Sequence, residues 1–260
     1  MALDPDLRAA LATLAATPHL LVALDFDGTL APLVERAEDA RALPASGTAL
    51  RALAALPGTT TALVSGRALD SLRVVAEPPE DTMMIGSHGA ETWTGPDGAP
   101  LALRPEQAGL LARAVDVVER TIAAHPGTRI EFKPAGVVLH TRTASDDVAD
   151  SAVTAARAGL EDLADLSITD GKRVLEISVI KADKGQGLAL LRETTGATAV
   201  LFAGDDVTDE HALRTLLPDD VGIRVGPGET AARFTVASPE DFSEVLSELV
   251  SLRTQVHPAQ

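Results

Sequence analysis

The segment from Leu24 to Leu30, Leu-Asp-Phe-Asp-Gly-Thr-Leu, most constrains what this chain can fold into. It closes the apolar run 20–24 with two aspartates and a glycine turn. The run is typical of a buried parallel strand, and Asp-Gly is typical of the turn that ends it. Open α/β sheets bind ligands at the carboxyl ends of their strands, where this pattern places Asp25 and Asp27. Two ionised carboxylates about 4 Å apart repel by roughly 4 kcal/mol at an effective dielectric near 20, so we expect a cation or a function to compensate them.

The length indicates two domains, or one domain with a large insert, and the composition argues against binding of polyanions. The 260 residues carry a net charge of −16, with no lysine- or arginine-rich run, which argues against nucleic acid and anionic membrane surfaces as partners. No apolar run approaches the roughly 20 residues of a membrane span. Cysteine is absent, and the acidic start lacks the charge pattern of a signal peptide. We therefore expect a cytoplasmic protein whose core consists of Ala, Val, Leu and Ile, because aromatic residues are few.

The order of apolar and amphipathic segments predicts an α/β fold with an insertion. Strands alternating with helices at both ends of the chain indicate βαβ units; the predicted strands are 20–24, 59–64, 82–86, 198–203, 221–225 and 234–236. After a turn-rich link at 94–100, the order becomes helix, hairpin, helix, hairpin: 105–124, 128–142, 146–164, and 166–179 around Asp170-Gly171. We predict a Rossmann-like parallel-sheet core, residues 1–103 and 180–260, with an inserted α+β cap, residues 104–179.

Four polar clusters fall where predicted core strands end or core helices begin. They are Asp25-Phe26-Asp27, Ser65-Gly66-Arg67, Lys184-Gly185 and the run from Gly204 to Glu210, Gly-Asp-Asp-Val-Thr-Asp-Glu. A helix start with a hydroxyl and a glycine suits phosphate, and several aspartates suit a hard ion such as Mg²⁺. Together the clusters supply what phosphoryl transfer needs: a nucleophile, an acid/base, a metal site and cations. Taken singly, each also fits a structural role as a turn, a helix cap or a solvated lysine.

In this order, the four clusters resemble the four motifs of the haloacid-dehalogenase superfamily. The resemblance implies that Asp25 is a nucleophile and Asp27 a general acid/base. It also implies that Mg²⁺ is held by Asp25, by the Asp27 backbone carbonyl and by Asp205, with Asp209 in support. An acid at the position of Asp27 is the superfamily's pattern for phosphatases and mutases. The implied phosphate-binding residues are Ser65, Gly66 and Lys184.

The insertion and the loop before it are similar to the trehalose-6-phosphate phosphatases, in a resemblance that covers about residues 20–250. It rests on the segments 86–91, 131–133, 140–142 and 174–177. Strand alternation places Glu131 and Lys133 on one face and Ile130 and Phe132 on the other. A sugar bound without aromatic stacking needs such charged hydrogen-bonding groups, although a solvated face has the same alternation. The implied substrate-binding residues are Arg67, His88, Glu131, Lys133, Arg142 and Glu176.

The sequence therefore predicts Mg²⁺-dependent hydrolysis of trehalose 6-phosphate through an aspartyl-phosphate, with a small sugar phosphate as the partner molecule. The alternatives are another capped phosphatase acting on sucrose 6-phosphate or mannosyl-phosphoglycerate, a phosphomutase, and a non-catalytic sugar-phosphate-binding module. Whether the protein works with a trehalose-phosphate synthase is not determined by the residues.

Overall fold

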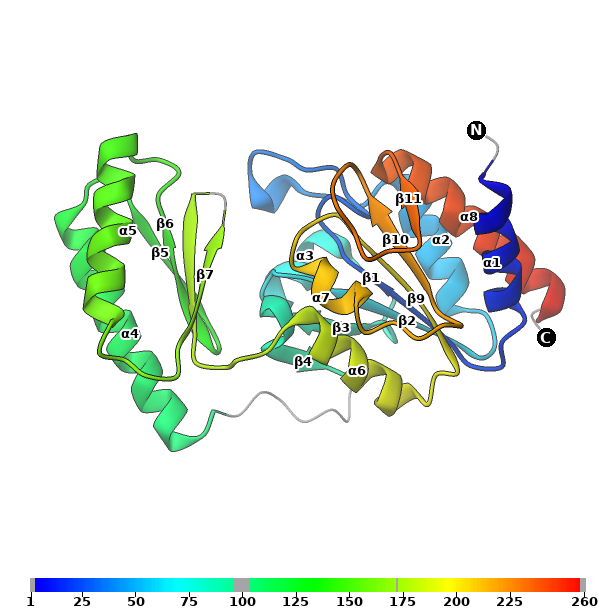
Figure 1. Cartoon of the computed structure of the whole chain (residues 1–260), viewed down its shortest axis with the longest axis horizontal. Coiled ribbons are helices and arrows are strands. Elements are labelled where there is room, and N and C mark those ends of the chain that lie inside the picture. The colour runs from blue at the N-terminus through cyan, green and yellow to red at the C-terminus, as the bar shows by residue number, and fades with distance from the viewer. Residues whose placement is uncertain (1–2, 96–102, 172, 258–260) are drawn as a thin grey trace. The chain divides into compact units, whose positions relative to one another are not determined.

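The structure, a computed structural model, describes residues 3–95, 103–171 and 173–257. Contacts divide the chain into two compact units, shown in Figure 1: Met1–Pro100 with Ala182–Gln260, and Leu101–Lys181. We call the first the core unit and the second the cap unit. Most of the predicted link at 94–100 lies outside the described residues.

The core unit is built on a seven-stranded sheet, counted over the described residues, in the order β11-β10-β9-β1-β2-β3-β4. Its strands are β1 (Leu20–Leu24), β2 (Thr59–Val64), β3 (Met83–Gly86), β4 (Glu91–Trp93), β9 (Ala199–Gly204), β10 (Val221–Val225) and β11 (Phe234–Val236). All neighbours pair in parallel except β3 and β4. Because β1 lies between β2 and β9, residues that follow these three strands meet at one edge of the sheet.

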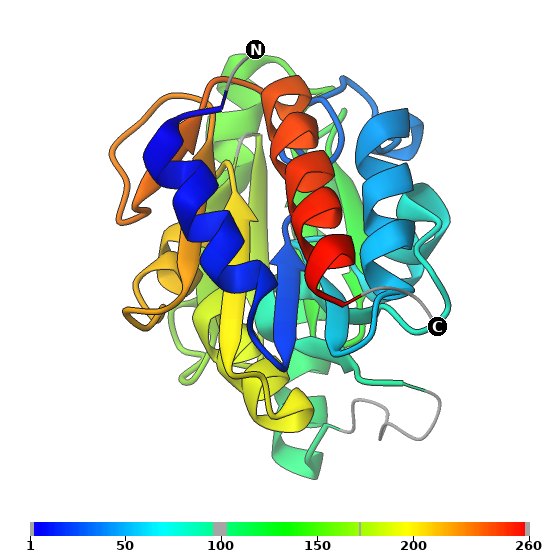
Figure 2. The same cartoon turned by 90° about the vertical axis from the view of Figure 1, so that its right-hand side faces the viewer.

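Helices cover both faces of this sheet. They are α1 (Pro5–Ala15), α2 (Pro44–Ala54), α3 (Leu69–Ala76), α6 (Lys184–Thr195), α7 (Asp209–Leu213) and α8 (Pro239–Val256), with short 3₁₀ turns η1 (Ala37–Asp39) and η2 (Ser87–Gly89). Figure 2 shows α1, α8 and α2 side by side over one face. Strand β1 turns Leu20, Val22 and Leu24 toward these helices and Leu21 and Ala23 toward α6 and α7. Burial on both faces explains why β1 is apolar at every position.

A buried arginine near the end of α8 joins this helix to the segments that lead into β1 and β2. Arg253 is fully buried, and its guanidinium donates hydrogen bonds to four backbone carbonyls and one hydroxyl: Ala15, Thr17, Pro57, Gly58 and the Thr59 side chain. These bonds satisfy the donors of a charge whose burial would otherwise be unfavourable. Arg253 thereby fixes the ends of α1 and α2 against the strands that follow them.

The cap unit packs two helices on one face of an antiparallel four-stranded sheet in the order β5-β6-β8-β7. The helices are α4 (Pro105–Ala124) and α5 (Asp146–Leu160), and the strands are β5 (Arg129–Lys133), β6 (Gly136–His140), β7 (Ser167–Gly171) and β8 (Val174–Ser178). Val137, Leu139, Leu175 and Ile177 form the apolar centre with the helices. The predicted alternation is confirmed for Ile130, but Phe132 on the same strand face remains 62% exposed.

Several local predictions differ from the structure in their boundaries, and one strand, β4, was not predicted. Asp170 and Gly171 do not form the turn of the second hairpin, because both lie in β7 and Gly171 pairs with Val174. The helix after Ser65-Gly66-Arg67 begins only at Leu69. The segment 209–217 was predicted as one helix, but α7 ends at Leu213 and is followed by i→i+3 hydrogen bonds from Thr215 and Leu216. The sequence gives no alternation over the three residues of β4, which was not predicted.

None of the helices in the described part of the chain has the length and apolar character needed to cross a bilayer.

Candidate active site

Asp25 stands immediately after β1, in the middle of the core sheet. Its backbone N–H donates to the carbonyl of Ala203 on β9 (2.9 Å), which continues the sheet by one residue. Its buried carboxylate accepts a hydrogen bond from Lys184 Nζ (2.7 Å). The turn that follows requires glycine, since Gly28 has φ +83° and a Cβ there would lie 2.0 Å from Asp205 Oδ2. The glycine thus allows the Asp205 carboxylate to approach the turn after β1.

Lys184, the first residue of α6, joins two of the acids. Its ammonium lies 2.7 Å from Asp25 Oδ1 and 2.7 Å from Asp209 Oδ1, and the three side chains are 3%, 5% and 0% exposed respectively. Burial disfavours the charged lysine, but the attraction of Asp25 and Asp209 outweighs it, and the pKa of Lys184 is raised. The lysine is therefore a fixed positive charge beside Asp25.

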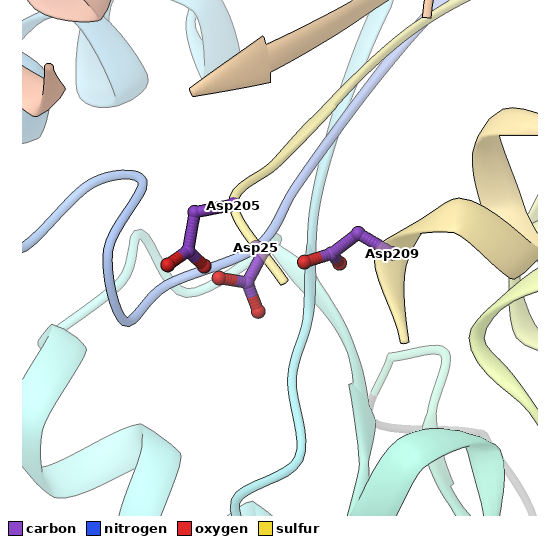
Figure 3. Close-up of side chains that lie close together, drawn as sticks. All are labelled: Asp25, Asp205 and Asp209. Atoms are coloured by element: carbon purple, nitrogen blue, oxygen red, sulfur yellow. The ribbon is translucent and has the colours of Figure 1, made fainter. Parts of the chain in front are cut away.

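Asp25, Asp205 and Asp209 form an acidic cluster in which one carboxylate oxygen from each residue lies within 4.8 Å of the other two (Figure 3). Burial raises the pKa of Asp25 well above its ordinary value, and the charges of Asp209 and Asp205 add to this while Lys184 opposes it. Burial, with Asp209 and Asp206 nearby, raises the pKa of Asp205 to about 7. One ammonium does not balance this concentration of negative charge. Oxygen donors with surplus negative charge fit a divalent cation.

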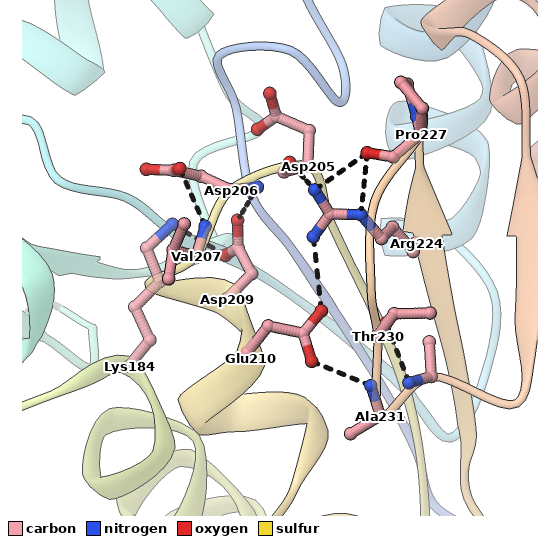
Figure 4. A network of polar contacts seen from close by, with 11 residues as sticks. Lys184, Asp205, Asp206, Val207, Asp209, Glu210, Arg224, Pro227, Thr230 and Ala231 are labelled. Carbon is pink, nitrogen blue, oxygen red and sulfur yellow. Dashed lines mark hydrogen bonds and ion pairs between the residues drawn. The ribbon is translucent and has the colours of Figure 1, made fainter. Parts of the chain in front are cut away.

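The loop that carries Asp205 and Asp209 is held by its own hydrogen bonds and by a buried arginine (Figure 4). Asp209 Oδ2 accepts from the backbone N–H of Asp206 (3.0 Å). Arg224, on β10, donates to the Asp205 carbonyl (2.8 Å) and to Glu210 Oε1 (3.2 Å). Burial favours the neutral form of Glu210, but hydrogen bonds from Ala231 and Thr230 and the nearby Arg224 outweigh it and lower the pKa of Glu210.

The Asp27 carboxylate is paired with an arginine and lies outside the acidic cluster. Arg67 Nε and Nη2 donate to its two carboxylate oxygens at 2.5 and 2.6 Å, in a fork-like ion pair. The guanidinium also lies over the Phe26 ring, 5.8 Å from its centroid. The Asp27 carboxylate is not a member of the acidic cluster among the described residues. If Asp27 donates a proton, at least one contact with Arg67 has to break first.

The loop after β2 is fixed by the loop after β3. Ser65 is buried, and its hydroxyl accepts the Arg67 N–H (3.2 Å) instead of capping a helix. The backbone N–H groups of Ser87 and His88 donate to the carbonyls of Arg67 (2.7 Å) and Ser65 (3.1 Å). Ser87 and His88 both adopt left-handed φ values of 48° and 55°. The His88 ring covers Gly66, where a Cβ would lie 2.4 Å from the ring. His88 is thus placed against the predicted phosphate-binding loop.

The predicted substrate residues of the cap unit lie mostly on one face of its sheet. Glu131 and Glu176 are in one cross-strand row, each opposite Val138. Glu131 Oε2 lies 2.7 Å from His140 Nε2, and Lys133 Nζ lies 3.3 Å from Glu176 Oε2. The hydrogen bond from His140 lowers the pKa of Glu131. Partial burial acts to raise this pKa, and the positive charge of Lys133 acts to lower it.

Arg142 departs from this arrangement. The predicted strand 136–142 ends at His140, so Arg142 occupies an exposed turn, and strand alternation does not set the direction of its side chain.

Sequence reasoning missed Arg224 and gave Glu210 no role. The available signal was the arginine inside the apolar segment Val-Gly-Ile-Arg-Val, residues 221–225. A charge in a buried strand needs a partner, but spacing along the chain does not single out Glu210, because Asp219, Asp220 and Glu229 lie nearer to Arg224.

The alternating core, the insertion and the acidic cluster after β1 and β9 define the class: this is the fold of the haloacid-dehalogenase superfamily phosphatases. The chain belongs to the trehalose-phosphatase family, whose model matches residues 23–240. A solved trehalose-6-phosphate phosphatase related protein is 26% identical, has a TM-score of 0.74, and is matched over 90% of this chain and 99% of that one.

Two mycobacterial relatives are longer than this chain. The trehalose-phosphate phosphatase of Mycobacterium marinum is 33% identical over 253 residues, which cover 90% of this chain and 62% of that protein. A Mycobacterium tuberculosis protein described as an uncharacterized glycosyl hydrolase is 34% identical over 243 residues, covering 88% of this chain and 18% of its own length. The chain therefore corresponds to a part of each of these relatives.

Proposed function

We propose that this chain is a phosphatase that hydrolyses trehalose 6-phosphate to trehalose and phosphate. The observation that carries the proposal is the convergence of Asp25 with Lys184, Asp205 and Asp209 at the centre of the core sheet. Family membership and the name of the Mycobacterium marinum relative support the choice of substrate.

In the first step, a carboxylate oxygen of Asp25 attacks phosphorus and the bond between phosphorus and the sugar oxygen breaks. Asp27 donates the proton that the departing sugar oxygen needs. The product is trehalose together with an aspartyl-phosphate on Asp25. Lys184 holds a positive charge beside the attacking carboxylate, where negative charge accumulates on the phosphoryl oxygens.

In the second step, Asp27, now a carboxylate, removes a proton from water. The water oxygen bonds to phosphorus, the bond to Asp25 breaks, and phosphate leaves with the Asp25 carboxylate restored. Asp27 thus acts first as an acid and then as a base. Its ion-pair contacts with Arg67 change between these two roles.

We propose Mg²⁺ as the cation, with Asp25, Asp205, Asp209 and the Asp27 backbone carbonyl as the groups that hold it. When bound, Mg²⁺ neutralises charge on the transferring phosphoryl group. The carboxylate oxygens fit a hard ion of this kind, and the raised pKa values of Asp25 and Asp205 reflect negative charge that such an ion would relieve.

The remaining predicted residues bind substrate in this proposal. Ser65 and Gly66, in a loop fixed by His88, bind phosphate with Lys184. The side chains proposed to hydrogen-bond sugar hydroxyls are Arg67 and His88 in the core unit, and Glu131, Lys133, Arg142 and Glu176 in the cap unit. Pairing of Glu131 with His140 and of Lys133 with Glu176 orients these groups before a sugar arrives. We also propose a cytoplasmic setting; nothing in the described residues indicates a synthase partner.

A phosphate-release screen of the full chain tests the proposal. Trehalose 6-phosphate, sucrose 6-phosphate, mannosyl-phosphoglycerate and p-nitrophenyl phosphate are compared with Mg²⁺ and with EDTA. We expect the highest kcat/KM on trehalose 6-phosphate, and no release in EDTA. Preference for another sugar phosphate would replace the substrate. Transfer between sugar positions would indicate a mutase, and calorimetric binding without phosphate release would indicate a non-catalytic module.

A further inference from the structure

The buried ion pair between Arg224 and Glu210 has no role in the chemistry proposed above. Arg224 lies on β10 with its side chain 10% exposed, and Glu210 lies on α7 with its side chain 6% exposed. An arginine and a glutamate removed from water are costly unless their geometry and other hydrogen bonds compensate. Well-packed apolar residues at such positions often stabilise a fold equally well, so stability alone does not explain this pair. Its contacts with other groups indicate its role.

The guanidinium of Arg224 joins the backbone of the loop that carries Asp205 to the backbone of the loop after β10 (Figure 4). Arg224 Nη2 donates to the carbonyl of Asp205 (2.8 Å) and to that of Pro227 (3.1 Å), and Nη1 donates to Glu210. The other oxygen of Glu210 accepts the N–H of Ala231 (2.8 Å). Arg224 therefore holds the Asp205 peptide, and Glu210 is anchored to the loop after β10.

The Asp205 peptide needs such a restraint. Its carboxylate is gathered within 4.8 Å of those of Asp25 and Asp209, and like charges at this distance repel. The carboxylate also lies against the turn at Gly28, which leaves no space for a Cβ. Repulsion would move Asp205 outward in the absence of a cation, and a hydrogen bond to its carbonyl opposes that movement.

We propose that Arg224 is a positioning residue: with Glu210 as its anchor, it holds the Asp205 backbone so that the carboxylate is preorganised for a divalent cation. This inference rests on the proposed function for the identity of the site. It adds a residue that touches neither the cation nor the substrate, and whose loss weakens cation binding. Outer residues that orient metal ligands typically contribute about 10- to 100-fold to metal affinity.

Another ion pair of the core unit provides a matched control. Arg192 on α6 pairs with Asp220, whose carboxylate is 1% exposed and accepts the backbone N–H groups of Val200 and Leu217. The Arg192–Asp220 pair thus fixes backbone as the Arg224–Glu210 pair does, but these hydrogen bonds do not involve Asp25, Asp205 or Asp209. Arg192→Met should destabilise the fold without changing the cation site.

The test measures binding of Mn²⁺ alone to the full chain, by the electron paramagnetic resonance signal of free Mn²⁺, beside thermal unfolding. For Arg224→Met we expect the Kd of Mn²⁺ to rise about 10-fold or more, while Arg192→Met binds Mn²⁺ as the wild type does. Arg224→Lys keeps a cation but cannot span both acceptors, so we expect an intermediate Kd. A folded Arg224→Met protein with the wild-type Kd would overturn the inference.

Two further variants cover a failure to fold. Arg224→Met with Glu210→Gln avoids leaving an unpaired buried charge, and should show the same weakened Mn²⁺ binding. If neither Met variant folds, Arg224→Lys decides: a Kd equal to that of the wild type contradicts the inference. Failure of the proposed function is distinct, because the wild type itself would then release no phosphate in the presence of Mg²⁺.

Discussion

The core unit and the cap unit hold their charged side chains in different ways. In the core unit, Lys184 and its two aspartates are at most 5% exposed, and their contacts are 2.7 Å long. In the cap unit, Glu131 and its partner His140 are 45% and 33% exposed, although Lys133 is well buried. The same types of residue therefore experience a strong, weakly screened field in one unit and a more hydrated one in the other.

This difference separates the chemistry that each unit suits. Burial and mutual repulsion raise the pKa of Asp25 and Asp205, and a divalent cation would relieve that repulsion. Exposed pairs exchange their hydrogen bonds with an incoming ligand at little cost, which suits hydroxyl recognition. Changes at Asp25, Lys184, Asp205 and Asp209 should therefore affect every phosphate ester alike, whereas changes in the cap unit should depend on the sugar.

The largest effect is expected from Asp25→Asn. The amide keeps the shape but removes the nucleophilic oxygen, so kcat should fall by about 10⁴-fold or more on trehalose 6-phosphate and p-nitrophenyl phosphate alike. Phosphate release measures this, and circular dichroism checks that the fold survives. Near-normal turnover on either substrate would exclude Asp25 as the nucleophile.

A smaller loss is expected from breaking the fork-like ion pair of Arg67 with Asp27. Asp27→Asn and Arg67→Met should each lower kcat/KM by about 100-fold or more, because acid–base catalysis commonly contributes this much. Since the two side chains act on each other, the double variant should lose much less than the product of the single losses. Fully multiplicative losses in this double-mutant cycle would show that Arg67 acts independently of Asp27.

The cap unit should show selective loss. Removing the carboxylate in Glu131→Ala deletes a charge-assisted hydrogen bond, so kcat/KM on trehalose 6-phosphate should fall about 10- to 100-fold. Activity on p-nitrophenyl phosphate, which has no sugar, should be nearly unchanged. Glu119→Ala, at an exposed position of α4, is the matched control. Equal losses on both substrates would remove Glu131 from sugar recognition and erase the contrast between the units.

The smallest effect concerns stability in the absence of cations. The pKa of Asp205 rises from an ordinary 3.8 to about 7, and that of Asp25 also rises, so the folded state binds more protons than the unfolded state between these pH values. The contribution of these two carboxyl groups to the free energy of unfolding is thus greatest below pH 3.8. It declines as the pH rises to about 7. In EDTA, Tm should fall by a few °C over this range, more in the wild type than in Asp205→Asn. A Tm that rises across it in wild type relative to Asp205→Asn would contradict the raised pKa.

The parallel sheet was readily predicted, because burial on both faces leaves uninterrupted apolar runs. The predictions for 20–24, 59–64 and 221–225 are confirmed to the residue, as is the α/β fold. The predicted helix 105–124 is confirmed in the cap unit as well. Turn positions were less predictable, since the Asp170-Gly171 pattern also fits the end of a strand, where both residues pair with β8.

The acidic cluster was foreseen from strand ends, but the partners of its members were not. Spacing indicates which residues reach one sheet edge, yet it does not say that Arg67 engages Asp27 or that Lys184 joins Asp25 to Asp209. Those choices depend on side-chain packing between segments far apart along the chain. Arg224 escaped prediction for the same reason, because its acceptor is a backbone carbonyl that no sequence motif marks.

The central place of β1 between β2 and β9 has a consequence for synthesis of the chain. The strand Leu20–Leu24 is translated some 175 residues before one of its two neighbours, Ala199–Gly204, which is an interval of roughly 10 to 35 s at ordinary elongation rates. All segments of the cap unit are contiguous and complete before then. A nascent chain thus exposes an apolar strand edge throughout this interval, and we expect it to depend on chaperones more than a chain with sequentially paired strands.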